Sequence, residues 1–457
     1  MTTDAAALSH TESATPKDLP VSDRTRIMIY ISVLIFMLGF GVPFGGLIDS
    51  PISFFLKNKL HLQAHEVATF RLISGLPLYF GFLWGFVRDN WNPFGLRDRG
   101  YMIIFGFVAA ACYAVFAFVP VNAATLLGAV ILLTAACLFV QSAQTGLGAA
   151  ISRQHVMTGQ MSTVSNITVS LAALIPLTMG GYLSDQLEGR NAELAARILF
   201  LIGGGVMAAI ALYAIWRPKV VYDNVRVEQT EFHPVQDFVR LLKHWPVYPA
   251  LLIWTLWNFA PGSATPLQYY LQNTLHANDD AYTNWNAIFG GFFIPTYLIY
   301  GMLCRKVALR HLLFWGTLVA VPQMVPLLFT KTVPMALAAA APIGLMGGVA
   351  TAAYLDLLIR SCPKGLEGTI IMASNALYYL VSRAGDLLGT NIYEGIHLGP
   401  LNLPGGFGVC VIAITVVYAM IVPALWLVPK RLTATPDGVA PEGGGFDAEG
   451  DKPAVTF

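Results

Sequence analysis

The sequence predicts an all-α integral membrane protein in which twelve transmembrane helices form two six-helix bundles. Composition is the first reason: 56% of the 457 residues are hydrophobic and only 12% are charged, about half the charged fraction of a typical soluble domain. The mean hydropathy of +0.61 agrees. The second reason is that apolar residues form runs of roughly 20 residues or more, long enough to cross a bilayer as a helix. Backbone polar groups cannot stay unpaired in lipid, so such runs should be helical.

Twelve apolar segments follow one another along the chain, and a polar stretch divides them six and six. The first bundle, 26–216, holds the segments 27–55, 67–87, 101–119, 124–150, 161–183 and 198–216. The second bundle, 247–429, holds the segments 247–271, 287–304, 312–329, 334–359, 368–393 and 407–428. A central cytoplasmic loop, 217–246, joins the bundles. The ends, 1–25 and 430–457, are polar or rich in Gly and Pro, and we expect both to be disordered.

The positive charges predict the orientation. Most of the 27 lysines and arginines fall in segments that face the cytoplasm if both termini are placed inside. Because cytoplasmic loops are enriched in Lys and Arg, both termini should be cytoplasmic. We expect a monomer that spans the lipid bilayer of the bacterial inner (plasma) membrane. The polar start of the chain lacks the short apolar core of a cleaved signal peptide.

Several function classes are disfavoured. The net charge of +1 and the lack of a basic arm argue against a nucleic-acid partner. The five cysteines form no CxxC pair, so we expect no disulfide framework, no metal and no other cofactor. No GxxxxGK[ST] motif for an ATP-driven pump occurs. A polytopic membrane enzyme stays as an alternative, but its only adjacent acidic pair, Asp279-Asp280, lies in an outer loop. We expect no enzymatic activity.

An internal repeat relates the two halves. Sliding 158–186 by 209 positions onto 367–395 superimposes Gly159 on Gly368 and Asn166 on Asn375. In the same alignment, Arg383 falls opposite Leu174 and Asp386 falls opposite Leu177. The duplicated scaffold therefore does not itself require these two charges, which belong to the second half alone.

The eleventh segment has a polar side. At 100° per residue, seven side chains share an arc of roughly 100°. They are Asn375, Tyr379, Ser382, Arg383, Asp386, Thr390 and Tyr393. Two interpretations compete, because charges within a membrane need a partner or a water-filled cavity. Arg383 and Asp386 either form a salt bridge that holds the helices in register, or bind an anionic substrate group and a proton, respectively.

The seventh segment offers a second polar side, with Trp257, Asn258, Gln268 and Tyr269 as candidate substrate contacts. Pro261-Gly262 and Pro266 should break this helix near its middle, as discontinuous helices at transport sites do. Its aromatic rings suit a planar ligand. A kinked packing helix is the alternative. Gln141 in the fourth segment is a further candidate contact, or a donor between helices.

Three more charged residues are candidates for coupling or gating. Asp49 in the first segment is a candidate proton site, or else a cap at a helix break before Pro51. Asp356 and Arg360, spaced i,i+4 in the tenth segment, should form a gate or a structural pair.

The stretch from Gly85 to Tyr101 resembles the loop signature of the major facilitator superfamily, with Asp89, Arg97 and Arg99 in its charged positions. The resemblance implies the major facilitator fold and a cytoplasmic latch between the halves. In that latch Asp89 caps a helix end, and the arginines pair with Asp89 or with neighbouring helix ends. The equivalent loop of the second half, 301–310, lacks the acid, so a latch there should be degenerate. Two longer stretches, 72–101 and 356–389, resemble the folate–biopterin transporter branch, and the muropeptide permease-like branch is a close competitor.

These features together predict a secondary active transporter that works by alternating access. Its substrate should be a small polar solute, such as a planar organic anion of the pterin or folate type, carried by proton symport. An efflux antiporter and a muropeptide or sugar permease of the same fold remain alternatives. A non-transporting membrane scaffold is the alternative of another class.

Overall fold

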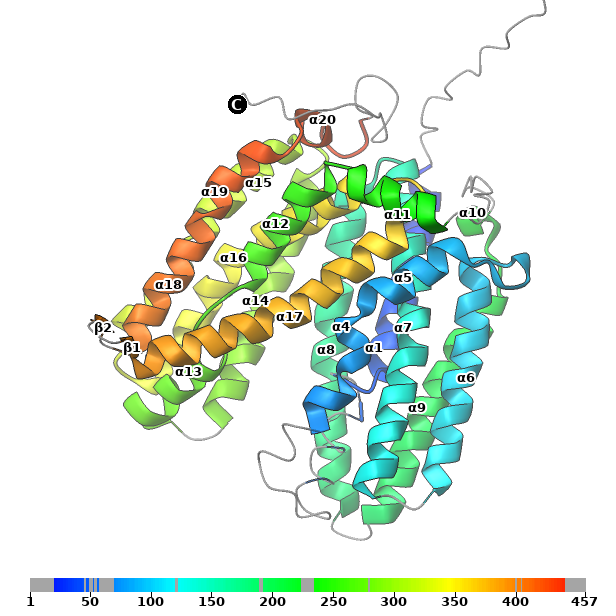
Figure 1. Ribbon diagram of the computed structural model, residues 1–457, viewed down its shortest axis with the longest axis horizontal. Coiled ribbons are helices and arrows are strands. Elements are labelled where there is room, and N and C mark those ends of the chain that lie inside the picture. Colours follow the sequence, from blue (N-terminus) through cyan, green and yellow to red (C-terminus); the bar gives the residue numbers. More distant parts are fainter. Residues whose placement is uncertain are drawn as a thin grey trace, which may run out of the picture.

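The computed structural model describes residues 20–44, 47–48, 52, 56, 70–119, 122–188, 192–222, 234–277, 280–398, 401–403 and 405–439. Helices dominate this part of the chain, and one short antiparallel hairpin, β1 (Ile396–Leu398) with β2 (Leu401–Leu403), adjoins them. Figure 1 shows two groups of helices side by side, one from each half of the sequence.

The first half contains α1 (Val21–Gly41), α4 (Leu76–Tyr79), α5 (Gly81–Asn90), η1 (Pro93–Gly95), α6 (Asp98–Phe118), α7 (Ala123–Gln154), α8 (Thr158–Glu188) and α9 (Ala192–Ile215). Two short helices, α10 (Lys219–Tyr222) and α11 (Pro234–Lys243), follow it. The second half contains α12 (Val247–Asn258), α13 (Thr265–Tyr269), η2 (Tyr270–Thr274), α14 (Asp280–Leu303), α15 (Leu309–Ala320), η3 (Val325–Phe329), α16 (Val333–Ser361), α17 (Glu367–Glu394), α18 (Phe407–Ala419), α19 (Ile421–Ala424), η4 (Leu425–Leu427) and α20 (Lys430–Thr433).

Each half has its own apolar core. One cluster of buried side chains draws its members from residues 27 to 221, with Tyr101, Tyr113 and Leu133 fully buried. The other draws almost all its members from residues 247 to 432, and its large side chains Trp285 and Tyr354 are each 1% exposed. Burial of a large apolar side chain is worth roughly 1.5–3 kcal/mol, so each half is stabilised mainly by its own core.

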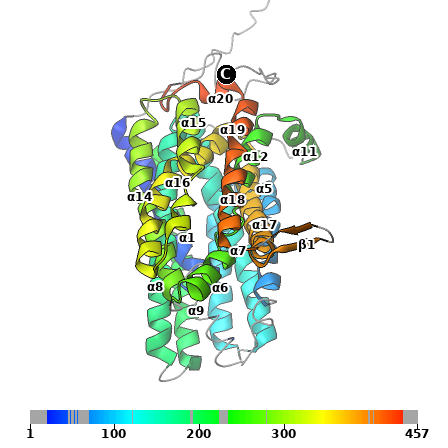
Figure 2. The same ribbon diagram turned by 90° about the vertical axis from the view of Figure 1, so that its left-hand side faces the viewer.

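The halves meet through two matched pairs of helices. α5 and α7 of the first half pack on α17, and α14 and α16 of the second half pack on α8. The sequence repeat superimposes α8 on α17. The two parts of the interface are therefore arranged alike, each with one of these repeated helices packed on two helices of the other half. Figure 1 shows α17 reaching from the second half to α5, and Figure 2 shows the bundle from its side.

Glycine permits the closest of these approaches. A methyl group at Gly85 would overlap the carbonyl oxygen of Gly368, which lies in the first turn of α17. The helices α5 and α17 therefore touch backbone to backbone at this point.

Eight helices in the described residues are long and apolar enough to cross a membrane. They are Val21–Gly41, Asp98–Phe118, Ala123–Gln154, Arg197–Ile215, Asn284–Leu303, Leu309–Phe329, Val333–Ser361 and Phe407–Leu427. Large apolar side chains such as Phe118, Leu212 and Trp315 are exposed on them. Apolar surface of this kind is expected where a protein faces lipid.

Two predicted segments are discontinuous. The first predicted segment begins with α1, which ends at Gly41, and Val42 is extended because Pro43 follows it. The predicted break in the seventh segment is confirmed: α12 ends at Asn258 and α13 begins at Thr265, with Gly262 at a φ of +106° between them.

The end of the chain differs from the sequence-based prediction, which treats 430–457 as disordered. Residues 430–433 form α20, and the described chain continues to Val439 against the starts of α8 and α15. The composition of this tail is typical of disorder, but long-range polar contacts, described below, hold residues 430–439 in place.

Candidate functional site

Arg383 and Asp386, the two charges on α17, do not pair with each other. The carboxylate of Asp386 accepts hydrogen bonds from the backbone N–H and the hydroxyl of Thr265, both at 2.8 Å. Arg383 is exposed, and among the described residues no carboxylate lies within 4.0 Å of its guanidinium. The sequence predicts that α17 spans the membrane, where a cation costs roughly 3 kcal/mol on insertion scales, so Arg383 is expected to face a water-filled space rather than lipid.

Asp386 caps the second part of the broken helix. The first N–H groups of a helix have no partner within it, and Thr265 is the first residue of α13. Asp386 supplies the acceptor from a helix 121 positions away in the sequence. Just beyond it, a methyl group at Gly389 would overlap the backbone nitrogen of Gly262, so α17 packs directly on the linker between α12 and α13.

The remaining candidates on the seventh segment separate into two groups. Trp257 is buried in the core of the second half, stacked on Tyr418 with ring centroids 4.8 Å apart and edge-on to Tyr354. Its ring is therefore covered by other side chains of the protein, so a ligand cannot stack on it in this structure. Tyr269, by contrast, is half exposed, and its ring lies 6.3 Å from that of Tyr393 on α17.

Four other candidates are partly buried. Asn258 donates its side-chain amide to the carbonyl of Trp254 at 2.8 Å. Gln268 lies on α13 beside Tyr269. Asn375 and Tyr379 lie on α17, one turn apart, and the amide of Asn375 is 3.9 Å from the sulfur of Met372.

Two further candidates were predicted in the first half. Gln141 is partly buried on α7, a helix that packs against α17. Asp49, the second candidate proton site, lies outside the described residues.

Asp89 links the two halves at one end of the molecule. Its buried carboxylate accepts hydrogen bonds from the backbone N–H and the hydroxyl of Thr369 in the first turn of α17, both at 2.6 Å. It is paired with Arg88 at 2.5 Å, and Arg88 also pairs with Asp98 at 2.5 Å. Burial raises the pKa of Asp89 to about 6, although Arg88 and Thr369 act in the opposite direction.

A second ion pair joins the halves beside Asp89. Arg153, near the C-terminal end of α7, lies 3.0 Å from Glu367, the first residue of α17, and both side chains are almost fully buried. Breaking a buried pair by removing one partner typically costs about 3–5 kcal/mol. We call the end of the molecule that contains Asp89, Glu367 and Arg360 the latched end.

The pair of Asp356 and Arg360 is confirmed on α16. Both side chains are buried, with Nε of Arg360 2.9 Å from the carboxylate, and the hydroxyl of Tyr300 donates to the same carboxylate at 2.7 Å. Arg360 also donates to the hydroxyl of Thr158 in the first half, at 3.0 Å. The pair is thus both structural and part of the contact between the halves.

Of the two partners predicted for Arg97 and Arg99, a neighbouring helix end is the one that Arg99 binds. Arg99 donates to the carbonyls of Ala214 and Ile215 at the end of α9, at 3.1 and 2.8 Å. Its guanidinium also covers the ring of Tyr222. Arg97 has a φ of +51°, and its N–H donates to the side chain of Asn92. These contacts stay within the first half, so Arg88 is the arginine that pairs with Asp89.

Sequence reasoning missed several latch residues. They are Arg88, Arg153, Glu367, Thr369 and Asp437. One signal was available for Glu367, Thr369 and Asp437. The repeat places the starts of α8 and α17 in register, and the N-terminus of a helix favours a carboxylate, here from the other half.

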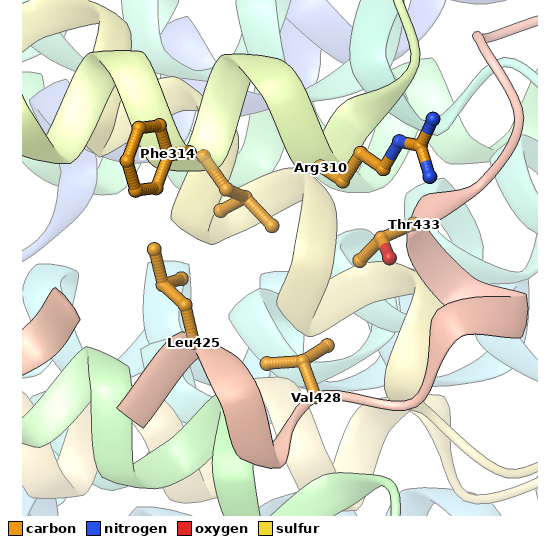
Figure 3. Close-up of a pocket in the computed structure, with 6 residues that line it drawn as sticks. Arg310, Phe314, Leu425, Val428 and Thr433 are labelled. Carbon is orange, nitrogen blue, oxygen red and sulfur yellow. The ribbon is translucent and has the colours of Figure 1, made fainter. Parts of the chain in front are cut away.

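A small apolar pocket lies in the second half, near the end of the chain. Leu313, Phe314, Leu425 and Val428 line it, with Arg310 and Thr433 at one side (Figure 3). It does not include the polar side of α17. No group of three or more possible metal ligands occurs among the described residues.

Comparison with known proteins agrees with this architecture. The BT1 family profile matches residues 44–338, more than half of the chain. Comparison with curated proteins finds no match.

Three solved structures illustrate the similarity of the fold. The major facilitator superfamily transporter FucP, in its outward conformation, has a TM-score of 0.62 at 13% identity, over 87% of this chain and 97% of that one. The proton:xylose symporter XylE has a TM-score of 0.61 at 12% identity, over 91% and 98%. The human organic anion transporter MFSD10 has a TM-score of 0.56 at 14% identity, over 89% and 100%.

At these identities the solved structures establish the fold alone, and the family follows from the profile match. The eight apolar helices add that the chain crosses the membrane several times. The protein belongs to the BT1 family, the folate–biopterin transporter family, and is a multi-pass membrane transporter of the major facilitator type.

Proposed function

We propose that this transporter carries a small organic anion with a planar part, of the pterin or folate class, together with a proton. Transport would proceed by alternating access, with the two halves rocking about a site between them. The latched end is taken as the cytoplasmic end, as the distribution of lysines and arginines predicts.

The observation that carries the proposal is the placement of Arg383. Its charge lies on α17, which the sequence predicts to span the membrane. Arg383 is exposed and has no carboxylate partner among the described residues, while the neighbouring acid is bound elsewhere. A guanidinium presents a planar fork of donors that matches a carboxylate or a phosphate. We therefore assign the anionic group of the substrate to Arg383. Asn375, Tyr379, Gln141, Asn258, Gln268 and Tyr269 are assigned to the rest of the substrate.

Asp386 is proposed as the proton carrier. Its two hydrogen bonds to Thr265 require an acceptor, so a proton on the carboxylate would weaken the cap at the start of α13. Proton binding would thus loosen the second part of the broken helix. That coupling would connect protonation with movement of the end opposite the latch. Asp49 is kept as a second candidate carrier.

The test is uptake into proteoliposomes across a panel of folates, pterins, nucleosides, sugars and muropeptides, with and without an inward proton gradient. We expect accumulation of an anionic member of the panel only with the gradient. Arg383→Gln should raise the half-saturating concentration at least 10-fold. Arg310→Gln, an exposed arginine on α15, is the matched control and should leave it unchanged.

Two results would contradict the proposal. Uptake that is independent of the gradient would exclude symport, and export driven by an opposite gradient would favour an antiporter. Equal affinities in the Arg383→Gln and Arg310→Gln variants would remove Arg383 from the substrate site.

A further inference from the structure

The last described residues, 434–439, form a strap that touches both halves of the protein. The strap follows α20, which lies at the same end of the molecule as α5 and α11 (Figure 1). Asp437, in its middle, is 4% exposed. A polar tail would normally stay in water, so its burial needs specific partners.

Backbone contacts fix the strap on each side. The N–H of Asp437 donates to the carbonyl of Cys304, just after α14, at 2.8 Å. The next N–H, that of Gly438, donates to the carbonyl of Val156, between α7 and α8, at 2.7 Å. Two consecutive residues are therefore bonded to opposite halves.

The side chain of Asp437 adds a second set of contacts across the same boundary. Its carboxylate accepts from the backbone N–H groups of Gly159 and Gln160 at 3.2 and 3.1 Å, and from the Gln160 side chain at 3.1 Å. These groups form the first turn of α8. Arg360 of the second half lies 3.9 Å away and also donates to the carbonyls of Leu432 and Thr435.

This arrangement repeats the Asp89 latch with the halves exchanged. The alignment by 209 positions places Gln160 opposite Thr369, and these two residues give their backbone N–H to Asp437 and Asp89, respectively. An arginine flanks each carboxylate, Arg360 in one case and Arg88 in the other. The loop 301–310, where the sequence predicts a degenerate latch, lacks an acid. Asp437 of the strap, which lies much later in the sequence, supplies that acid.

We propose that the strap is a gating element, in which Asp437 is the carboxylate of a second latch and must leave the start of α8 before the latched end can open. The inference rests on the alternating-access part of the proposed function. It goes beyond that function by assigning the C-terminal segment a role in the conformational cycle. Because Val156 and Cys304 belong to different halves, the strap cannot keep both backbone bonds when the halves separate there.

The chain contains its own reporter for release of the strap. Cys304 is 2% exposed, and its carbonyl is bonded to Asp437. This burial keeps an alkylating reagent from the Cys304 thiol while the strap is in place. Opening of the latched end should expose this thiol to an alkylating reagent. Cys410, buried in the core of the second half with its thiol 3.4 Å from the carbonyl of Gly389 on α17, serves as the internal reference.

The experiment measures alkylation by N-ethylmaleimide at each cysteine, by peptide mass spectrometry, in the full-length protein in proteoliposomes. Asp437→Asn places an amide N–H against the donors of Gly159 and Gln160, so it should detach the strap. We expect Cys304 to react at least 10-fold faster in Asp437→Asn than in the wild type. Cys410 should be unchanged in both proteins. Asp23→Asn, at an acid 3.7 Å from Arg26 on α1, is the matched control and should behave as the wild type.

The proposal is overturned if Cys304 reacts at the same rate in Asp437→Asn, Asp23→Asn and the wild type. A faster reaction at both Cys304 and Cys410 would indicate general unfolding and would also overturn it. Uptake assays separate this result from the proposed function. Faster Cys304 alkylation in a protein that transports none of the panel would support the strap but contradict the assigned substrate class. Normal uptake of a panel member with unchanged Cys304 alkylation would support the assigned substrate class but contradict the strap.

Discussion

At the scale of single residues, Arg383 and Asp386 on α17 have different surroundings although they lie one turn apart. Asp386 is engaged by Thr265, whereas Arg383 is exposed and has no carboxylate within 4.0 Å among the described residues. A helix turn of 5.4 Å is enough to place one side chain against a neighbouring helix and the other toward open space. Spacing along a helix therefore does not by itself imply a salt bridge.

Asp386→Asn is predicted to separate accumulation from exchange. The amide cannot take up and release a proton, but it still presents one oxygen to Thr265, so the fold should survive. We expect gradient-driven accumulation to fall at least 10-fold. Exchange of external for internal substrate, which needs no net proton movement, should be retained. Accumulation at the wild-type level would show that the proton is carried elsewhere, with Asp49 as the next residue to substitute.

A pH dependence is predicted for the Asp89 latch. The pKa of Asp89 is raised to about 6 by burial and would return toward its ordinary value near 4 when water enters. The latched state therefore binds the proton more tightly than the open state. Its relative stability is greatest below pH 4 and declines as the pH rises through 6, by up to about 3 kcal/mol.

Label distances across the latched end, followed from pH 7.5 to 5, test this prediction. The latched fraction should increase as the pH falls. Asp89→Asn should reduce that response. A latched fraction that rises with pH would contradict the sign of the effect.

At the scale of elements, the contact between α5 and α17 depends on backbone approach. Gly85→Ala should lower the melting temperature by several degrees, because the added methyl group overlaps the Gly368 carbonyl. Gly128→Ala on α7 is the matched control, since nothing lies within 4 Å of a methyl group there. Alanine stabilises a helix interior by roughly 0.5–1 kcal/mol over glycine, so the control should be neutral or slightly more stable. Equal melting temperatures of the Gly85→Ala and Gly128→Ala variants would contradict this prediction, because they would show that α5 and α17 can move apart without loss of stability.

Much of the arrangement of helices and helix breaks could be predicted from the sequence. Apolar runs predicted the helices, Pro261, Gly262 and Pro266 predicted the break in the seventh segment, and i,i+4 spacing predicted the pair of Asp356 and Arg360. These are local signals. The partners of Asp386, Asp89 and Asp437 could not be predicted, because each acid binds a helix start more than 100 positions away. The role of Arg88 was missed for a different reason: it lies near Arg97 and Arg99, and the sequence does not distinguish which of these arginines pairs with Asp89.

At the scale of the whole molecule, the two halves are joined firmly at one end. Asp89 and Arg153 reach the start of α17, and Arg360 and Asp437 reach the start of α8. In Figure 1 the ribbons of the halves converge at this end and diverge toward the end that contains α13. Such an arrangement suits a transporter whose site is open on the side opposite the latch.

The most direct test of this account is a pair of distance measurements between spin labels in lipid bilayers, in a background with the native cysteines replaced by alanine. Labels at exposed positions 91 and 364 report on the latched end, and labels at exposed positions 124 and 391 report on the opposite end. We predict a short distance at the latched end in the resting protein. On addition of the transported anion at low external pH, the distance between 91 and 364 should lengthen as that between 124 and 391 shortens. Distances that stay fixed at both ends, or that lengthen together, would contradict alternating access by this protein.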